Sequence, residues 1–326
     1  MEPKGPIDSA AFCRGAIDSE TAAFVERQTQ QDRRRPYLFD VGVPRLRALQ
    51  ERFTVAGPVQ PSPMAQEREI PGPAGAISVR VFLPETVRGA YLHFHGGGYV
   101  LGRAIHSDAR NEAIARNCGV AVVSVDYRRA PEDPYPAGPD DCEAAALWLV
   151  EHAKAEFGSE RLVIGGESAG ATFSAVTLVR LRDRHGLRPF AAANLLYGNY
   201  DLFGTPSLEL YGDRRLVTDR PVSHWFHDTY VPRERQREPD VSPLYADLDR
   251  LPPALFSIGT DDPLRDDTLF MYLRWLAAGN LAELAVYPGG PHMFDAFDLK
   301  IAHDAQARID RFIAEAVSQQ RRAAGE

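Results

Sequence analysis

The sequence predicts a doubly wound α/β fold, in which a mostly parallel central sheet is flanked by helices. From about residue 77 onward, short apolar runs alternate with longer segments of helical spacing. Several of the runs are almost continuously apolar, as strands buried on both faces of a parallel sheet are. The length of 326 residues and an apolar fraction of 44% allow a large buried core.

A proline-rich joint divides the chain near its start. Residues 1–55 are mainly polar, with apolar side chains at helical spacing in their second half. The segment 57–63 then carries three prolines and breaks this pattern. We therefore expect an N-terminal helical segment, 1–55, followed by a main domain, 56–326.

Strands and helices alternate after the joint, which is the order of a parallel sheet. Strands are expected at 77–83, 90–95, 120–125, 162–165, 192–197, 254–259 and 285–287. Helices are expected at about 107–117, 139–156, 169–183, 264–278 and 296–319.

One interval, about 203–240, interrupts the alternation. It has no clear strand, and it contains Tyr211, Trp225, Phe226 and Tyr230 among many charges. A stretch of this length is either a functional lid or disordered, and its aromatic side chains favour an ordered lid. We expect it to form a helical cap together with the N-terminal helices.

Composition excludes several classes of function. A formal net charge of −8 argues against a nucleic-acid surface, and the isolated basic run Arg33–Arg35 is best explained as a solvated face. The sequence has no secretory signal region and no stretch apolar enough to span a membrane. Cys13, Cys118 and Cys142 have no metal or disulfide spacing, so we expect a cytoplasmic protein. No metal or organic cofactor is implied.

The segment Gly166-Glu167-Ser168-Ala169-Gly170 follows an apolar strand and precedes a helical stretch. A sharp strand-to-helix turn crowds the residues two before and two after the serine, so both need to be glycine or nearly so. Such a turn holds the serine hydroxyl out at the carboxyl end of the sheet. Ser168 is therefore the candidate nucleophile, although this pattern also occurs by chance.

Upstream, a strand leads into a glycine loop, His95-Gly96-Gly97-Gly98. Acyl transfer generates an oxyanion that needs preorganised N–H donors, and consecutive glycines can turn their N–H groups into a cavity. The expected donors are the N–H groups of Gly96, Gly97 and Ala169. The alternative, a phosphate-binding loop, lacks the Lys-Ser/Thr that should follow.

These motifs resemble the hormone-sensitive-lipase family of α/β-hydrolases over about residues 70–300. The resemblance rests on motifs in family order, namely His95–Gly98, Asp126–Glu132, Gly166–Gly170, Leu251–Leu255, Asp262–Leu264 and Pro291-His292. It implies the α/β-hydrolase fold, a bacterial carboxylesterase-like activity, and a bracing role for Asp126 and Glu132. The sequence departs from the family at Glu167, Ala171 and Met293, which bears on substrate preference.

The base and the acid follow the nucleophile in the order Ser, acid, His that α/β-hydrolases share. Among the downstream histidines, only His292 lies in a turn just after a late strand. The resemblance to the Asp-Pro-Leu motif makes Asp262 the acid, with Asp261 as its rival one residue away. His93 is expected to be satisfied within its strand, His95 to brace the loop, and His303 to pack or lie at the surface. His224 and His227 lie in the expected lid and could line the pocket without acting in the chemistry, and His185 is not placed in such a turn.

Together these residues predict a serine carboxylesterase that hydrolyses short- to medium-chain acyl esters. An amidase, a lactonase or a specialised biosynthetic hydrolase would use the same residues. A non-catalytic small-molecule receptor is the alternative outside catalysis, and the presence of Ser168, Asp262 and His292 argues against it. Dimers are frequent in the family, so a homodimer is a further expectation.

Overall fold

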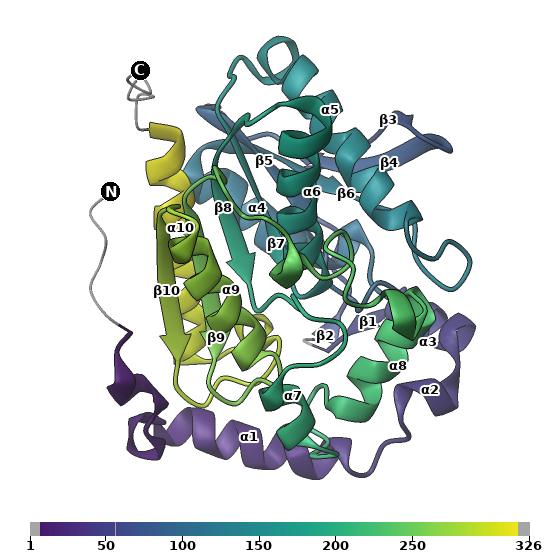
Figure 1. Cartoon of the computed structure of the whole chain (residues 1–326), viewed down its shortest axis with the longest axis vertical. Coiled ribbons are helices and arrows are strands. Elements are labelled where there is room, and N and C mark those ends of the chain that lie inside the picture. Colours follow the sequence, from purple (N-terminus) through teal and green to yellow (C-terminus); the bar gives the residue numbers. More distant parts are fainter. Residues whose placement is uncertain (1–6, 56, 319–326) are drawn as a thin grey trace.

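A mixed sheet forms the centre of the molecule in the computed structural model, which describes residues 7–55 and 57–318 (Figure 1). Within these residues the strand order is β10-β9-β8-β7-β5-β6-β4-β3. Neighbouring strands are parallel from β10 to β6, whereas β4 pairs antiparallel with both β6 and β3. The predicted, mostly parallel sheet is confirmed. The strands are β3 Ala65–Gly72, β4 Gly75–Phe82, β5 Gly89–Phe94, β6 Val120–Val125, β7 Leu162–Glu167, β8 Phe190–Leu196, β9 Ala254–Gly259 and β10 Ala282–Tyr287.

Strand β3 was not predicted from apolar spacing. It is an edge strand, and most of its side chains are exposed or only partly buried, so its sequence lacks the apolar run of a central strand. The predicted joint is also more regular than expected. A two-stranded sheet of β1 Phe53–Thr54 and β2 Gly57–Pro58 spans the boundary, although residue 56 lies outside the described residues.

Helices cover both faces of the sheet. Helices α4 and α10 pack on one face, and α5, α6 and α9 pack on the other, each over its own apolar core. Their bounds are α4 Asp108–Cys118, α5 Ala137–Phe157, α6 Ala169–His185, α9 Arg265–Ala277 and α10 Lys300–Ser318. Each agrees with a predicted helix, except that the last begins later than the expected residue 296. A 3₁₀ turn occupies Phe294–Ala296, and residue 319 lies outside the described residues.

Amphipathic spacing explains why α10 packs where it does. Ile301, Ala305, Ile309 and Phe312 recur at intervals of three or four residues, and all are buried against the sheet. Burying a side chain the size of isoleucine or phenylalanine contributes ~1.5–3 kcal/mol. Among the described helices, none combines the length and the apolar content needed to cross a lipid bilayer.

The end of the sheet toward which the arrows of β8 and β10 point is covered by further helices (Figure 1). They come from two separate parts of the chain, namely α1 Ser19–Asp32, α2 Leu38–Val41 and α3 Val43–Gln50, and then α7 Pro206–Tyr211 and α8 Arg220–Tyr230. The 203–240 interval thus contains α7, α8 and a 3₁₀ turn at Arg233–Arg235.

Polar contacts join the two parts of this covering layer. The guanidinium of Arg215 stacks on the ring of Tyr37 at 3.7 Å and donates to the carbonyl oxygens of Asp32 and Arg35. The N–H of Val217 donates to the Asp32 carboxylate at 2.9 Å. The N-terminal helices and the later insertion therefore form one connected roof.

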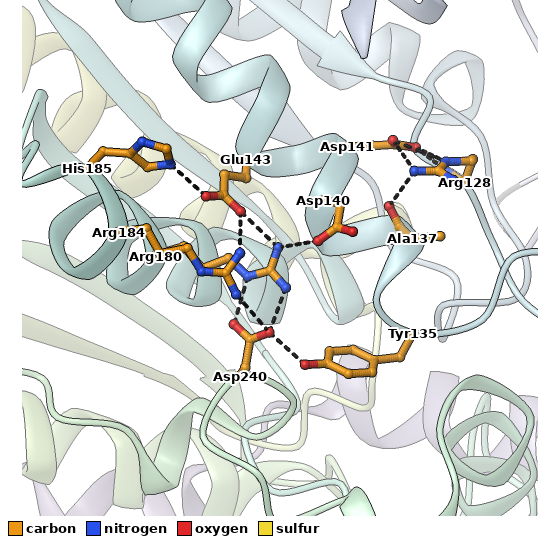
Figure 2. A network of polar contacts seen from close by, with 10 residues as sticks. All are labelled: Arg128, Tyr135, Ala137, Asp140, Asp141, Glu143, Arg180, Arg184, His185 and Asp240. Carbon is orange, nitrogen blue, oxygen red and sulfur yellow. Dashed lines mark hydrogen bonds and ion pairs between the residues drawn. The ribbon is translucent and has the colours of Figure 1, made fainter. Parts of the chain in front are cut away.

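A buried arginine, Arg180, links the covering layer to the helices that pack on the sheet (Figure 2). Arg180 of α6 contacts Asp140 and Glu143 of α5, and it binds both carboxylate oxygens of Asp240 at 2.7 and 2.6 Å. Tyr135 donates to the same Asp240 carboxylate at 2.7 Å. These contacts hold Asp240, at the end of the 203–240 interval, against α5 and α6.

Candidate active site

Ser168 lies in a sharp turn between β7 and α6. Its φ of +55° is in the left-handed region, which side chains with a Cβ rarely adopt. A Cβ on either Gly166 or Gly170 would collide with the carbonyl oxygen of Phe94 in the neighbouring strand β5. The two glycines of the motif are therefore required by the close approach of β5, as the crowding argument predicted.

His292 reaches Ser168 from the loop that follows β10. Its Nε2 lies 2.9 Å from Ser168 Oγ, and its Nδ1 lies 2.8 Å from Asp262 Oδ2. Because an ionised carboxylate only accepts hydrogen bonds, Nδ1 donates to Asp262 and Nε2 accepts from the Ser168 hydroxyl. The structure thus brings the three predicted residues together in one hydrogen-bonded chain.

The loop after β9 holds Asp262 in place. Its second oxygen, Oδ1, accepts the N–H of Leu264 at 2.8 Å, and only 2% of the residue is exposed. The rival Asp261 is oriented differently, since its carboxylate pairs with both terminal nitrogens of Arg214 in the covering layer. Asp262 is therefore the acidic residue that contacts His292.

The glycine loop after β5 differs from the prediction at one position. The N–H of Gly96 donates to Glu167 Oε1 at 3.0 Å, so it is not free to bind an oxyanion. Within the described part of the chain, the N–H groups of Gly97, Gly98 and Ala169 have no acceptor. Gly97 and Gly98 have φ values of +127° and +61°, which favour glycine. The set of free donors therefore contains Gly98 in place of Gly96.

His95 braces this loop, as expected. Its ring stacks on Tyr127 at 4.1 Å, and its Nδ1 donates to the carbonyl oxygen of Gly96 at 2.7 Å. Burial lowers the pKa of His95 to about 4, so the imidazole is neutral near pH 7. His93 is also satisfied inside the sheet, where it lies 2.8 Å from Ser124 Oγ and 2.9 Å from Glu167 Oε2.

Asp126 and Glu132 act as braces, in agreement with the prediction. Asp126 accepts from the side chain of Arg103 at 2.8 Å, and Glu132 pairs with Arg47 at 2.8 Å. Arg47 also donates to the carbonyl oxygens of Val100 and Ala130. The contacts of Arg47 tie the segment after the glycine loop, at Val100, and the segment at 130–132 to helix α3 of the covering layer.

The other downstream histidines are engaged elsewhere. His185 contacts Glu143, His303 contacts the exposed Asp298, and His224 contacts Glu209. His227 is buried in α8 and lines the cavity, and burial lowers its pKa to about 3. His292 is thus the histidine that contacts Ser168.

Sequence reasoning missed Tyr197, which directly follows β8. Its ring packs edge-on against His292, with centroids 4.8 Å apart, and its hydroxyl donates to the partly buried Asp295. Its φ of +37° is unusual for tyrosine, so in the structure the backbone identifies this position as a candidate for a functional role. In the sequence Tyr197 is only the last residue of the apolar run expected as a strand, 192–197, which carries no comparable signal.

A cavity of about 780 Å³ opens over Ser168 and His292. Leu216, Val222 and Phe226 of the insertion line it, as do Tyr37 and Leu46 of the N-terminal helices. The cavity is thus roofed by both parts of the covering layer and has an apolar lining around the serine. Such a site takes small, mainly apolar molecules.

Comparison with known proteins agrees with this geometry. A family model described as the alpha/beta hydrolase fold matches residues 91–296. The chain is 38% identical over 237 residues to the carboxylic ester hydrolase LipN of Mycobacterium tuberculosis, a match that covers 69% of this chain and 62% of that protein. It is 37% identical over 243 residues to the carboxylesterase NlhH of the same organism, covering 71% of this chain and 75% of that protein.

A solved structure, an esterase of Pyrobaculum calidifontis, superposes with a TM-score of 0.75 at 28% identity. The superposition covers 95% of this chain and 99% of that one. The likeness therefore includes the covering layer as well as the sheet. The chain belongs to the alpha/beta hydrolase fold family, in its hormone-sensitive-lipase group.

Proposed function

We propose that this protein is a serine carboxylesterase that acts on short- to medium-chain acyl esters. The observation that carries the proposal is the chain of hydrogen bonds from Ser168 Oγ through His292 to Asp262, at the base of a roofed apolar cavity. The relatives named as carboxylic ester hydrolases and carboxylesterases support the same reaction.

Acylation begins when Ser168 Oγ attacks the ester carbonyl carbon and its proton passes to His292 Nε2. Asp262 holds the imidazole through Nδ1 and stabilises the imidazolium that forms. The carbonyl oxygen becomes an oxyanion that accepts from the N–H groups of Gly97, Gly98 and Ala169. Losing one such donor costs about 2.7–4 kcal/mol of transition-state stabilisation.

The same groups complete acylation and then hydrolyse the acyl-enzyme. When the tetrahedral intermediate collapses, the alcohol leaves with the proton held by His292, and the acyl group stays on Ser168 Oγ. A water molecule then gives a proton to His292 and attacks the acyl carbon. Collapse of the second intermediate releases the carboxylic acid and returns the proton to Ser168.

A chain-length series of p-nitrophenyl esters, from acetate to dodecanoate, tests this function. We expect the highest kcat/KM at two to eight acyl carbons, because the roof closes over the serine. Ser168→Ala should abolish turnover while the protein remains folded by circular dichroism. Matched p-nitroanilides and a lactone distinguish an esterase from an amidase or a lactonase. Absence of hydrolysis across the whole panel would contradict the proposal.

We further propose a cap made of residues 1–55 and 203–240, resting on a catalytic domain that provides the remainder of 56–326. Cys118 and Cys142 are buried and unpaired and Cys13 is exposed and unpaired, which supports a reducing, cytoplasmic location. A homodimer is the assembly that we expect, and light scattering at several protein concentrations would test it.

A further inference from the structure

Glu167 directly precedes Ser168, at the end of β7, and its side chain is the centre of a cluster that the proposed mechanism does not use. About a fifth of the side chain is exposed, toward the cavity. Its sequence position is also one of the departures from the family, which usually has Asp or Thr there.

The Glu167 carboxylate binds three separate elements. Oε1 accepts the Gly96 N–H at 3.0 Å and the Ser107 hydroxyl at 3.1 Å, and Oε2 lies 2.9 Å from His93 Nε2. His93 Nδ1 lies 2.8 Å from Ser124 Oγ and 3.2 Å from Asn111 Nδ2, and its Nε2 donates to Glu167. One residue of the nucleophile turn thus holds β5, the glycine loop and the turn at 104–107.

The anchored residue, Gly96, precedes the free N–H groups. A peptide unit is planar, so fixing a carbonyl oxygen also fixes the N–H of the next residue. The Gly96 carbonyl accepts from His95 Nδ1 at 2.7 Å, which orients the Gly97 N–H. The Gly97 carbonyl accepts the Leu101 N–H at 2.8 Å, which orients the Gly98 N–H. Glu167 binds the Gly96 N–H, which belongs to the peptide plane directly before these two.

The electrostatics of Glu167 agree with a fixed carboxylate. Burial raises its pKa, but the charge and hydrogen bond of His93 and the Gly96 N–H lower it more, so the pKa lies below its ordinary value. The group is therefore ionised near pH 7 and accepts from all of its neighbours. An aspartate would be one methylene shorter and would not span the same distance from the β7 backbone to Gly96.

We infer that Glu167 is a positioning residue of the oxyanion hole, whose carboxylate fastens the glycine loop to the nucleophile turn. This inference rests on the proposed esterase function and adds a specific determinant of its rate. Since an oxyanion exists only after attack on the carbonyl, the loss of this fastening should lower kcat and leave KM nearly unchanged.

Three substitutions distinguish the hydrogen bonds of the Glu167 carboxylate from its negative charge. Glu167→Asp shortens the side chain, and Glu167→Ala removes it, so each should lower kcat ~10–100-fold. Glu167→Gln removes the charge but keeps the reach. Its Oε1 can still accept from Gly96. Its amide can donate to a His93 Nε2 that carries no proton, because Nδ1–H can then donate to Ser124 Oγ or to the Oδ1 of a flipped Asn111 amide. We therefore expect kcat for Glu167→Gln within about threefold of the wild type.

Glu143→Gln is a matched control. Glu143 is also largely buried and also contacts a histidine, His185 at 2.8 Å, but it lies in the Arg180 cluster away from the cavity (Figure 2). The control should alter stability and leave kcat within about twofold of the wild type. All variants are made in the full chain and compared per active site, titrated with a fluorophosphonate.

The test combines kcat and KM for p-nitrophenyl butyrate with the Ki of a trifluoromethyl ketone. That inhibitor forms a tetrahedral adduct whose oxyanion needs the same donors, so Ki should rise by the factor by which kcat falls. If Glu167→Asp and Glu167→Ala fold and keep both values within twofold, or if Glu167→Gln is as impaired as Glu167→Ala, the inference is overturned. Should Glu167→Ala fail to fold, Glu167→Asp and Ser107→Ala test the same point, with an expected loss of about two- to fivefold in kcat for Ser107→Ala.

The inference and the function can fail separately. If the wild type hydrolyses no ester but Ser168 still reacts with the fluorophosphonate, the esterase proposal fails. The rate of that reaction still reports on the donors, because the probe's phosphoryl oxygen occupies the same position. If the fluorophosphonate then reacted at the same rate with the wild type, Glu167→Asp and Glu167→Ala, the role of Glu167 would be overturned.

Discussion

Ser168 holds a strained backbone conformation because the residues around it leave no alternative. A non-glycine residue in the left-handed region costs on the order of 1–3 kcal/mol, which the surrounding structure must offset. The Ser168 N–H donates to the Leu196 carbonyl at 3.0 Å, and α6 begins immediately after it. This geometry keeps Oγ within reach of His292 before any substrate binds.

Asp262→Asn tests the assignment of the acid at the residue scale. An amide at this position can donate to His292 and so favours the wrong tautomer, which removes the base from Ser168. We expect kcat to fall by about four orders of magnitude, measured with p-nitrophenyl butyrate at pH 7.5.

Asp261→Asn is the matched control for that substitution. It weakens the ion pair with Arg214 but leaves the Asp262–His292 bond intact, so kcat should stay within about fivefold of the wild type. A larger loss in Asp261→Asn than in Asp262→Asn would reverse the assignment.

How far the sequence predicted the site depended on how local each interaction is. Gly166 to Gly170 specify a turn through contacts within a few residues, so Ser168 was predictable. Gly96 could not be assigned, because its N–H is taken by the side chain of Glu167, 71 positions away. Asp262 could be separated from Asp261 only by the resemblance to a family motif, and the structure supplies the reason in Arg214.

At the scale of elements, the Arg180 cluster joins α5, α6 and the segment that carries Asp240 (Figure 2). Only 2% of the Arg180 side chain is exposed, whereas Asp240 and Asp140 retain 26% and 36%. The arginine is thus fully desolvated among carboxylates that water still reaches. Helix α6 also begins at Ala169, one of the free donors, so the cluster supports the element on which the site is built.

Arg180→Leu should reduce the free energy of unfolding by about 2–4 kcal/mol. It leaves Glu143 and Asp240 without their main cation in a partly buried position. Urea unfolding followed by circular dichroism measures the change. Arg116→Ala, which removes an ion pair of a 60% exposed side chain, should change stability by less than about 0.5 kcal/mol. If the two substitutions reduced the free energy of unfolding equally, the buried cluster would contribute no more to stability than an exposed ion pair does.

Element prediction succeeded where one face or both faces of an element are apolar. Helix α10 was predicted from its spacing, and the central strands from their continuous apolar runs. Strand β3 was missed because it is an edge strand whose exposed side chains are polar. The covering layer was predicted as ordered, but its contacts depend on pairs such as Arg215 and Tyr37, which no local pattern indicates.

At the scale of the whole molecule, two buried histidines make stability depend on pH. Burial lowers the pKa of His95 to about 4 and that of His227 to about 3. Between pH 6.5 and these values the unfolded chain binds protons that the folded chain does not, so each of these histidines makes stability fall as the pH falls. Burial raises the pKa of Asp267 to about 7, so that carboxyl contributes in the opposite direction as the pH falls below 7. Each such group contributes up to about 1.4 kcal/mol per pH unit within its window.

His227→Asn should remove one of these two contributions. Urea unfolding at pH 7.5, 6.0 and 5.0 measures it, and the loss of stability on acidification should be smaller in the variant than in the wild type. Because His227 lies in α8, the hydrogen-exchange protection factors of that helix, corrected for slower intrinsic exchange at pH 5, should fall in the wild type before those of α5 do. The same pH dependence in both proteins would mean that His227 does not cause it.

The central claim is that Ser168 is a nucleophile activated by His292 and Asp262, and its most direct test is the site of reaction with a fluorophosphonate. Intact-protein and peptide mass spectrometry should show one adduct per chain, on the peptide that contains Ser168, with activity lost in proportion. The adduct should be absent in Ser168→Ala and form far more slowly in His292→Ala. An unlabelled Ser168 in folded wild-type protein, or an adduct at another residue that accounts for the loss of activity, would contradict the account.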